Sequence, residues 1–414
     1  MQVEIITIGD ELLIGQVVDT NSAWMAKELN LAGIKVFQIT SVSDEENHII
    51  AALNEAKKRV DIVLMTGGLG PTKDDITKNT LCKYFNTALV FNEEAFRELE
   101  IIFKRFGREI TPRNKTQAEL PASCKAIINK KGTACGMWFE EEGKIFISMP
   151  GVPFEMKAMM SNDVIPLLKS RFTLPFILHK TILTQGIGES YLADKLGTFE
   201  EELPDSFKLA YLPSPGMVRL RLSASGNEMV VKQEMEKQQQ RLESIVAPFI
   251  YGYDEEALEE LIGKLLLPMN KTLSTAESCT GGYIAHLLTA VPGSSEYYMG
   301  STVTYSYQSK TDLLDVSEEL LYEFGAVSEQ VAKRMAEGAM LKFKTDYSIS
   351  TTGIAGPSGG TTEKPVGTVW VAIGTPDGII TKKFQFGGDR YRNIQLTATN
   401  ALNLLRKVLL KIPI

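Results

Sequence analysis

The segment from Val60 to Asp75, VDIVLMTGGLGPTKDD, decides the fold of the first part of the chain. It begins with an apolar run typical of a buried strand and continues directly into Gly67, Gly68 and Gly70. In an open α/β sheet, ligands bind just beyond the carboxyl ends of the strands. Glycine also allows backbone N–H groups to approach a phosphate closely. The segment therefore predicts a central strand followed by a ligand-binding loop.

The sequence around this segment alternates between strand patterns and helix patterns. Upstream, the expected elements are a strand at 3–9, a helix at 22–32, a strand at 35–42 and a helix at 46–59. The apolar residues of the first helix recur on one face, and Gly33 provides a stop signal. Because crossovers between parallel strands are right-handed, this order predicts a mostly parallel sheet covered on both faces, a three-layer αβα domain.

Two further strand ends are expected to meet the glycine loop. They lie in ITIGDELL, residues 6–13, and in SMPGVPFEM, residues 148–156. Carboxyl ends of parallel strands share one edge of a sheet, so the three loops predict one nucleotide pocket. Its candidate contacts are Gly9, Asp10, Glu11, Gly67, Gly68, Gly70, Thr72, Pro150 and Gly151.

The acidic pair Asp74 and Asp75 closes the glycine loop and is the candidate metal site. Carboxylate oxygens suit Mg²⁺ or a similar divalent cation, and Asp10 is expected nearby. Such an ion would activate water and offset developing charge. A plain turn before a helix start enriched in Asp is the alternative, since acidic residues are favourable at that position.

Changes of pattern divide the 414 residues into three domains, at 1–170, 171–252 and 253–414. The linker SRFTLPF, residues 170–176, contains a proline. In the middle domain apolar residues at 218, 220 and 222 alternate with Arg219 and Arg221, which predicts a small α+β domain with one solvated sheet face. The last domain is expected to be α/β, with strands at 302–307, 346–353, 368–374 and 379–386 before a long final helix.

The motif TAESCTGG, residues 275–282, places Ser278 between a strand pattern and the start of an apolar helix. Thr280, Gly281 and Gly282 form the turn, and the N–H groups of such a turn at a helix N-terminus favour negative charge. The turn therefore predicts a serine nucleophile beside an oxyanion hole. The alternative is that Ser278 only caps the helix and the glycines only allow a tight turn.

A base for this serine is offered by VTYSYQSK, residues 303–310, which is expected to be a strand ending in Lys310 with Tyr305 before it. A lysine can accept the proton if burial lowers its pKa from about 10.4 towards neutrality. A solvated lysine at a strand end and a packing tyrosine are the alternatives. Cys279 also competes as nucleophile, because a helix N-terminus can lower a thiol pKa.

Two more segments of the last domain suit a phosphorylated substrate. SISTTGIAGPSGG, residues 348–360, places Thr352 and Gly353 before a glycine-rich loop whose N–H groups can bind phosphate. GGDRYRNIQ, residues 387–395, places Arg390 and Arg392 at the start of the last helix, where arginine can bind phosphate oxygens in pairs.

Composition limits the possible partners and compartment. With 44 Lys and Arg against 51 Asp and Glu, the net charge of -7 gives no basic field for nucleic acid or anionic lipid, so small molecules are the expected partners. The N-terminal residues lack a signal-peptide pattern, no long uncharged apolar run occurs, and the 4 cysteines form no CxxC pair. A cytoplasmic protein without a cysteine-based metal site is expected.

Together, AESCTGG, TYSYQSK, TTGIAGPSGG and PVGTVWVAI resemble, in this order, the C-terminal domain of the CinA (competence/damage-inducible protein A) family. The resemblance spans residues 253–414 and implies an amidase that needs no cofactor. It would convert nicotinamide mononucleotide into nicotinic acid mononucleotide and ammonia. Ser278 would be the nucleophile, Lys310 and Tyr305 its activating partners, and Thr352 and Arg392 would lie near the substrate.

Residues 1–170 resemble the molybdopterin-binding, MoaB/MogA-like fold of the first domain of the same family, and the middle domain resembles its small KH-like segment. For members of this architecture the resemblance implies a homodimer and an ADP-ribose pyrophosphatase that depends on a divalent cation. This enzyme would release AMP and ribose 5-phosphate.

Three functions remain open at this point. The first is a bifunctional hydrolase that recycles pyridine nucleotides. The second is an amidase fused to a non-catalytic module that binds a pterin or a nucleotide, because a fold alone does not decide a function. The third is a regulatory or DNA-uptake scaffold, against which the net acidity argues.

Overall fold

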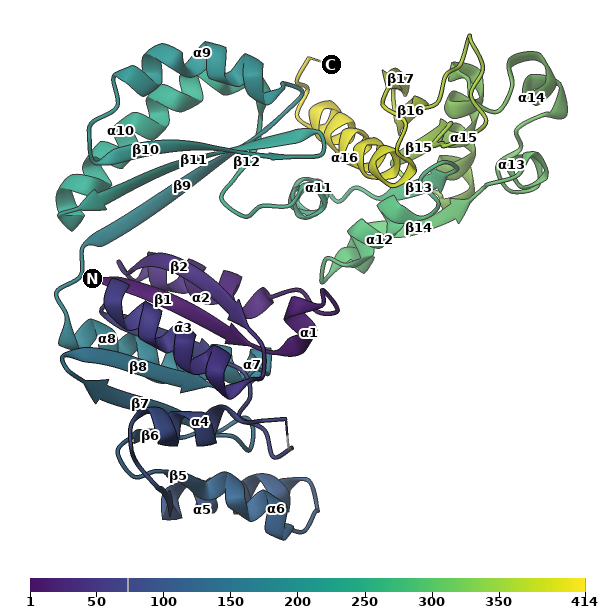
Figure 1. Cartoon of the computed structure of the whole chain (residues 1–414). Coiled ribbons are helices and arrows are strands. Elements are labelled where there is room, and N and C mark those ends of the chain that lie inside the picture. Colours follow the sequence, from purple (N-terminus) through teal and green to yellow (C-terminus); the bar gives the residue numbers. More distant parts are fainter. Residues whose placement is uncertain (73, 414) are drawn as a thin grey trace. The chain divides into compact units, whose positions relative to one another are not determined.

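A six-stranded sheet forms the centre of the N-terminal domain in the computed structural model, which describes residues 1–72 and 74–413 (Figure 1). Its strands, in spatial order, are β2 (Lys35–Val42), β1 (Gln2–Ile8), β3 (Ile62–Thr66), β8 (Lys144–Met149), β7 (Gly136–Glu141) and β6 (Lys125–Ile127). The first four are parallel, and β7 and β6 are antiparallel at one edge. The expected mostly parallel sheet is confirmed.

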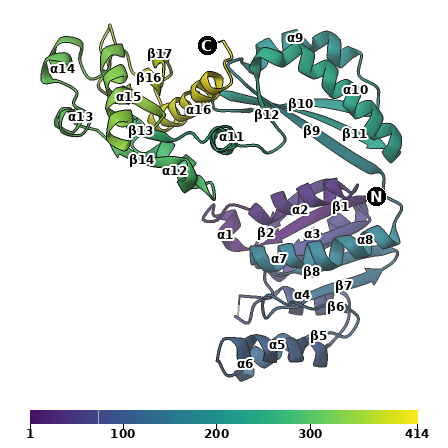
Figure 2. The same cartoon turned by 180° about the vertical axis from the view of Figure 1, so that it is seen from behind.

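Helices cover both faces of this sheet, as Figures 1 and 2 show from opposite sides. One face packs on α2 (Thr20–Leu31), α7 (Pro153–Met159) and α8 (Ile165–Arg171). The other packs on α3 (Glu46–Arg59), α4 (Thr77–Tyr84) and α5 (Glu93–Arg105). All five residues of β3 are buried, as the continuous apolar run of a two-sided strand requires.

Short elements complete this domain. They are α1 (Asp10–Leu13), β4 (Leu89–Phe91), α6 (Pro112–Lys115), β5 (Glu119–Pro121), a 3₁₀ turn at Thr116–Ala118 and a π-helical turn at Met160–Val164. The β4 and β5 strands pair with each other, apart from the main sheet.

The middle part of the chain has a four-stranded sheet in the order β10 (Phe207–Ser214), β11 (Met217–Gly226), β9 (Phe176–Gln185) and β12 (Ile250–Tyr253). Helices α9 (Glu189–Glu201) and α10 (Glu228–Val246) pack on one face. Along β11, Val218, Leu220 and Leu222 are buried while Arg219 and Arg221 are exposed, as the alternation predicts. The other face is only partly solvated, because Leu183 and Tyr251 belong to the core of the C-terminal domain.

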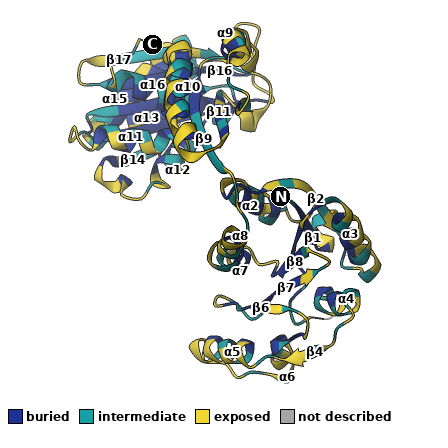
Figure 3. Cartoon of the chain, turned by 90° about the vertical axis from the view of Figure 1, so that its left-hand side faces the viewer, coloured by how far each residue is buried: buried dark blue, intermediate teal, exposed yellow. Residues whose placement is uncertain are grey.

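The C-terminal domain is a five-stranded mixed sheet between two helical layers. The strand order is β14 (Tyr298–Val303), β13 (Leu273–Glu277), β15 (Tyr347–Gly353), β16 (Thr368–Thr375) and β17 (Gly378–Gln385). One face packs on α11 (Leu258–Leu266), α12 (Tyr283–Thr289) and α16 (Arg390–Leu409). The other packs on α13 (Tyr307–Leu314), α14 (Glu318–Phe324) and α15 (Glu329–Phe343). Figure 3 shows buried residues along the strands and exposed ones on the outer helices.

One element of this domain differs from the sequence prediction. The strand expected at 302–307 ends at Val303, and Lys310 lies in helix α13. The cause is a reciprocal cap in which Ser306 Oγ accepts from Ser309 N–H and Ser309 Oγ accepts from Ser306 N–H. Such a capping box starts a helix even where β-branched and aromatic residues favour a strand.

The part of the chain that the structure describes contains two compact units, residues 1–178 with 225–232 and residues 179–224 with 233–414. Among its helices, none combines the length and the apolar character needed to cross a bilayer.

Candidate functional site

Ser278 and Lys310 meet inside the C-terminal domain. Ser278 directly follows β13, Lys310 lies in the first turns of α13, and Lys310 Nζ lies 3.0 Å from Ser278 Oγ. Ser278 is 9% exposed and Lys310 1%. The two residues are therefore within proton-transfer distance in a site that largely excludes water.

Lys310 forms no ion pair with any described residue. Its only other hydrogen bond in the described chain joins Nζ to the Thr304 carbonyl oxygen at 2.5 Å. Burial penalises the ammonium form and lowers the pKa of Lys310 from 10.5 to about 8. The reading of Lys310 as a solvated lysine is therefore wrong, and a substantial neutral fraction exists near physiological pH.

The turn after Ser278 depends on two glycines. Gly281 and Gly282 have φ values of +61° and +95°, which side-chain-bearing residues rarely adopt. The buried carboxylate of Glu277 accepts hydrogen bonds from the N–H groups of Gly282, Ile284 and Ala285 at 3.0, 3.1 and 2.8 Å. Glu277 therefore caps α12, a role that the sequence reading missed.

This cap changes the expected oxyanion hole. The N–H groups at the start of α12 already donate to Glu277, so they are not available to an oxyanion. Within the described residues, the N–H groups of Cys279 and Thr280 donate to no other residue. These two groups are the remaining candidate donors beside Ser278.

Cys279 is a poor nucleophile in this environment. It is buried, and burial raises the pKa of its thiol to about 12. The thiolate is the reactive form of cysteine, so a protonated buried thiol is unreactive. Ser278 is therefore favoured over its neighbour.

Hydrogen bonds with β15 fix the turn that contains Ser278. Ser278 N–H donates to the Thr351 carbonyl at 2.9 Å, and the hydroxyls of Thr280 and Thr351 lie 2.7 Å apart. Thr352 donates its hydroxyl proton to the Ala326 carbonyl at 2.6 Å. Gly353 is packed so tightly that a Cβ would lie 2.6 Å from a methyl group of Val369. Thr352 and Gly353 thus shape the strand end.

Tyr305 contacts an arginine and not the nucleophile. Its side chain is exposed, and its hydroxyl accepts from Arg390 Nη2 at 2.6 Å. Arg390 Nη1 donates to the Gly356 carbonyl at 2.7 Å. Arg392 is exposed, and its backbone N–H donates to Asp389. The structure therefore links Arg390, rather than Arg392, to Tyr305.

Asn393 is a buried polar residue near the same end of α16 that the sequence reading missed. Its Nδ2 donates to the carbonyls of Ala355 and Gly387, both at 2.9 Å, and its Oδ1 is buried without a protein partner. The sequence did offer a signal for this residue: Asn393 lies next to the apolar stripe of the last helix, and a buried amide needs hydrogen-bond partners.

The three predicted loops of the N-terminal domain line one cavity of about 380 Å³. The predicted residues on its wall are Gly9, Glu11, Gly67, Gly68, Gly70, Asp74, Asp75, Pro150 and Gly151. Asp10 and Thr72 lie beside it without lining it. Gly67 has a φ of +118°, and a Cβ there would lie 2.1 Å from the Ile8 carbonyl oxygen, so only glycine fits.

Asp75 shapes the glycine loop. Its carboxylate accepts from the N–H groups of Gly70 and Thr72, at 2.8 and 2.9 Å, and from the Thr72 hydroxyl. Asp74 is exposed, and the nearby Thr72 hydroxyl lowers the pKa of its carboxyl. Of the acidic pair, Asp74 is the residue free to meet a ligand.

Asp44 and Glu155 also line the cavity and were missed by the sequence reading. Asp44 exchanges hydrogen bonds with Asp10: each carboxylate accepts from the other residue's N–H, at 3.1 and 3.3 Å. Burial raises the pKa of Asp44, and nearby carboxylates add to the shift. Glu155 accepts from Asn129 Nδ2 at 2.6 Å, and burial raises its pKa as well. Asp44 follows a strand end, which was a usable signal.

The carboxylates of this cavity could supply only some of the ligands of a metal ion. Across residues 1–72 and 74–413, no three His, Cys, Asp or Glu side chains are placed to hold an ion together. Mg²⁺ is commonly held by one or two carboxylates together with substrate phosphates. The donor set suits an ion that arrives with a phosphate ligand.

Three family models match the chain. The CinA C-terminal domain matches residues 255–409, the probable molybdopterin binding domain residues 4–170, and the damage-inducible protein CinA KH domain residues 179–252. A CinA-like protein of Flavobacterium psychrophilum is 49% identical over 99% of both chains. A putative competence-damage inducible protein of Caldicellulosiruptor saccharolyticus is 40% identical over 99% of this chain and 100% of its own.

Among solved structures, the competence/damage inducible protein CihA from Agrobacterium tumefaciens is similar to part of the chain. It is 40% identical, covers 36% of this chain and 94% of its own, and has a TM-score of 0.36.

The first prediction concerns the pH dependence of Ser278. If the neutral amine of Lys310 accepts the Ser278 proton, its pKa of about 8 means that acylation of Ser278 by phenylmethylsulfonyl fluoride should rise with pH and level off above pH 8. Below that midpoint the rate should fall about tenfold per pH unit, following the neutral fraction. Mass spectrometry of the modified peptide measures this acylation rate. A pH-independent rate, or modification of Cys279, would contradict the assignment.

The second prediction concerns Glu277. Glu277→Gln places an amide NH₂ among three N–H donors, so we expect a loss of about 1–3 kcal/mol of unfolding free energy. Ser278 acylation should slow at least tenfold because the turn is displaced, while its midpoint stays near pH 8. Glu260→Gln, on the exposed side of α11, is the matched control and should change neither quantity. Unaltered acylation in Glu277→Gln would exclude a positioning role.

Proposed function

The chain belongs to the CinA family, and we propose that its C-terminal domain hydrolyses the amide of a nicotinamide nucleotide with Ser278 as nucleophile and Lys310 as base. The observation that carries the proposal is the 3.0 Å contact between Ser278 Oγ and the buried amine of Lys310, which pairs with no carboxylate in the part of the chain that the structure describes. A hydroxyl needs such a base because its own pKa leaves it unreactive.

The reaction runs in two halves. Neutral Lys310 accepts the Ser278 proton as Oγ attacks the amide carbon, and the resulting oxyanion is stabilised by the N–H groups of Cys279 and Thr280. Lys310 then gives this proton to the departing nitrogen, so ammonia leaves and an acyl-enzyme remains. Water attacks the acyl group while Lys310 takes its proton. Return of that proton to Oγ releases the carboxylic acid product.

A phosphate on the substrate is supported by the start of α16. Arg390 and Arg392 are exposed there, and their guanidinium groups can bind phosphate oxygens, whereas the helix start itself is already capped by the Asp389 carboxylate. Arg390 is already oriented by Tyr305 and Gly356. In this proposal Tyr305 positions Arg390 for the phosphate of nicotinamide mononucleotide. Thr352 and Gly353 shape the end of β15, which supports the Ser278 turn.

The third prediction tests this amidase. Ser278→Ala should abolish ammonia release from nicotinamide mononucleotide, and Lys310→Met should lower kcat by about 10²- to 10⁴-fold or more because the base is lost. Cys279→Ala is the control and should retain activity, since its thiol is buried and protonated. A coupled ammonia assay measures all three. Activity in Ser278→Ala together with loss in Cys279→Ala would overturn the proposal.

For the N-terminal domain we propose a pyrophosphatase that cleaves ADP-ribose into AMP and ribose 5-phosphate with a divalent cation. The cavity of about 380 Å³, with its glycine loops and carboxylates, supports this function. Asp44 and Asp74 would hold the ion together with diphosphate oxygens. When bound, the ion would activate water and neutralise the leaving phosphate. A non-catalytic nucleotide-binding module is the second candidate, since the same wall would serve binding alone.

The fourth prediction separates these two candidates. The full chain incubated with ADP-ribose and Mg²⁺ should release AMP, and Asp44→Asn and Asp74→Asn should each lower the rate by at least tenfold. Asp163→Asn, a carboxylate that does not line the cavity, should leave the rate unchanged. Chromatography of the products measures the rate. Binding of ADP-ribose without release of AMP would favour the binding module.

A further inference from the structure

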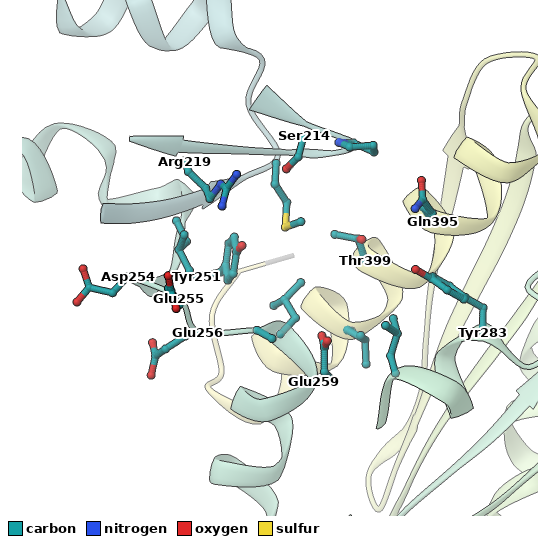
Figure 4. Close-up of a pocket in the computed structure, with 17 residues that line it drawn as sticks. Ser214, Arg219, Tyr251, Asp254, Glu255, Glu256, Glu259, Tyr283, Gln395 and Thr399 are labelled. Carbon is teal, nitrogen blue, oxygen red and sulfur yellow. The ribbon is translucent and has the colours of Figure 1, made fainter. Parts of the chain in front are cut away.

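A cavity of about 390 Å³ lies in the second compact unit, between the middle sheet and the C-terminal helices (Figure 4). Its walls come from β9, β10, β11, β12, α11, α12 and α16 and from the loop before α11. None of the residues already assigned to the amidase or pyrophosphatase sites lines it. It is therefore separate from both sites.

Specific packing holds the walls of this cavity together. Gly216, with a φ of +77° at the β10–β11 turn, packs on α16 so closely that a Cβ would lie 2.9 Å from a methyl group of Leu396. Arg406 Nη2 donates to the Ile250 carbonyl at 3.2 Å. Leu183 and Tyr251 of the middle sheet share one core with Leu402 of α16. The cavity thus lies in a packed interface.

Two opposite charges on the cavity wall, Arg219 and Glu259, are unpaired among the described residues. Asp254 pairs with Lys180 at 3.4 Å, and Glu256 pairs with Lys264 at 2.9 Å. In contrast, the side chains of Arg219 and Glu259 make no ion pair or hydrogen bond within the described residues. Figure 4 shows Arg219 beside Tyr251 on one side of the cavity and Glu259 on another side.

The remaining wall combines apolar and hydrogen-bonding groups. Apolar surface comes from Leu183, Met217, Leu258, Leu287 and Leu402. Figure 4 shows Thr399, Gln395 and Tyr283 on the side opposite Arg219. Asp254, Glu255 and Glu256 also line the cavity, so four carboxylates and one guanidinium contribute to its wall. A volume of this size that combines apolar surface with placed polar groups is typical of small-molecule sites.

We propose that this cavity binds a nucleoside 5′-monophosphate. Arg219 matches the phosphate, because a guanidinium binds phosphate oxygens in pairs. The Tyr251 ring and the Met217 thioether offer a flat apolar surface for the base. Glu259 accepts hydrogen bonds from the ribose hydroxyls, as acidic residues do in dinucleotide sites. The cavity thus provides one group for each part of this ligand.

The position of the cavity links its occupancy to Ser278. Tyr283 directly follows Gly282 of the catalytic turn, and Gln395 and Thr399 lie on α16, which begins at Arg390. A bound nucleotide would therefore contact α12, which follows the Ser278 turn, and α16, which begins at Arg390. This regulatory consequence depends on the proposed amidase function, whereas the binding itself does not.

Calorimetric titration of the full chain with AMP tests the binding. Arg219→Met should weaken AMP binding at least tenfold, which corresponds to 1.4 kcal/mol. Thr399→Phe should abolish it by filling the cavity. Arg221→Met, two residues along the same strand but outside the cavity, is the matched control and should bind within twofold of the original chain. Adenosine and ribose 5-phosphate should each bind at least tenfold more weakly than AMP.

Three results would overturn the proposal. They are no saturable AMP binding, equal affinity in Arg219→Met and Arg221→Met, and ribose 5-phosphate binding as tightly as AMP. If AMP binds only in the N-terminal cavity, Arg219→Met and Arg221→Met should show equal affinity, because Arg219 does not line that cavity. Arg219 is exposed, so its replacement keeps the test valid even if Thr399→Phe fails to fold. Ser278→Ala should bind AMP normally, which keeps this test independent of amidase turnover.

Discussion

The amine of Lys310 is buried, and no carboxylate in residues 1–72 or 74–413 pairs with it; the arrangement of the C-terminal site follows from this burial. The fall in its pKa from 10.5 to about 8 corresponds to about 3 kcal/mol, at 1.36 kcal/mol per pKa unit, that folding must supply at neutral pH. The packed helices α13 and α15 offset this cost. The fold therefore maintains a reactive amine at the expense of its own stability, as sites poised for catalysis often do.

The regular elements of the fold could be predicted from the sequence because their signals are local. Strand β2 and helix α3 lie where the apolar periodicities place them, and Gly33 ends α2 as expected. The start of α13 could not be read in this way. There, the reciprocal bonds of Ser306 and Ser309 outweigh the strand preference of the neighbouring residues.

The candidate sites were predictable in their motifs but not in the roles of single side chains. The pairing of Ser278 with Lys310 was expected from the two motifs, whereas the contact of Tyr305 with Arg390 joins residues 85 positions apart. Asp44 follows a strand end and Glu155 lies in one of the predicted loop segments, but only the folded sheet shows that both line the N-terminal cavity. Long-range neighbours of this kind decide which carboxylate or arginine is available to a ligand.

Asp75 and Glu277 have the same task in two unrelated domains: each closes its own turn with three hydrogen bonds. A turn that is shaped by its own carboxylate does not need a ligand to order it. Less conformational entropy is then lost when a ligand arrives, so a few contacts suffice for binding. The product, held by equally few contacts, can leave a site that stays in its working shape for the next encounter.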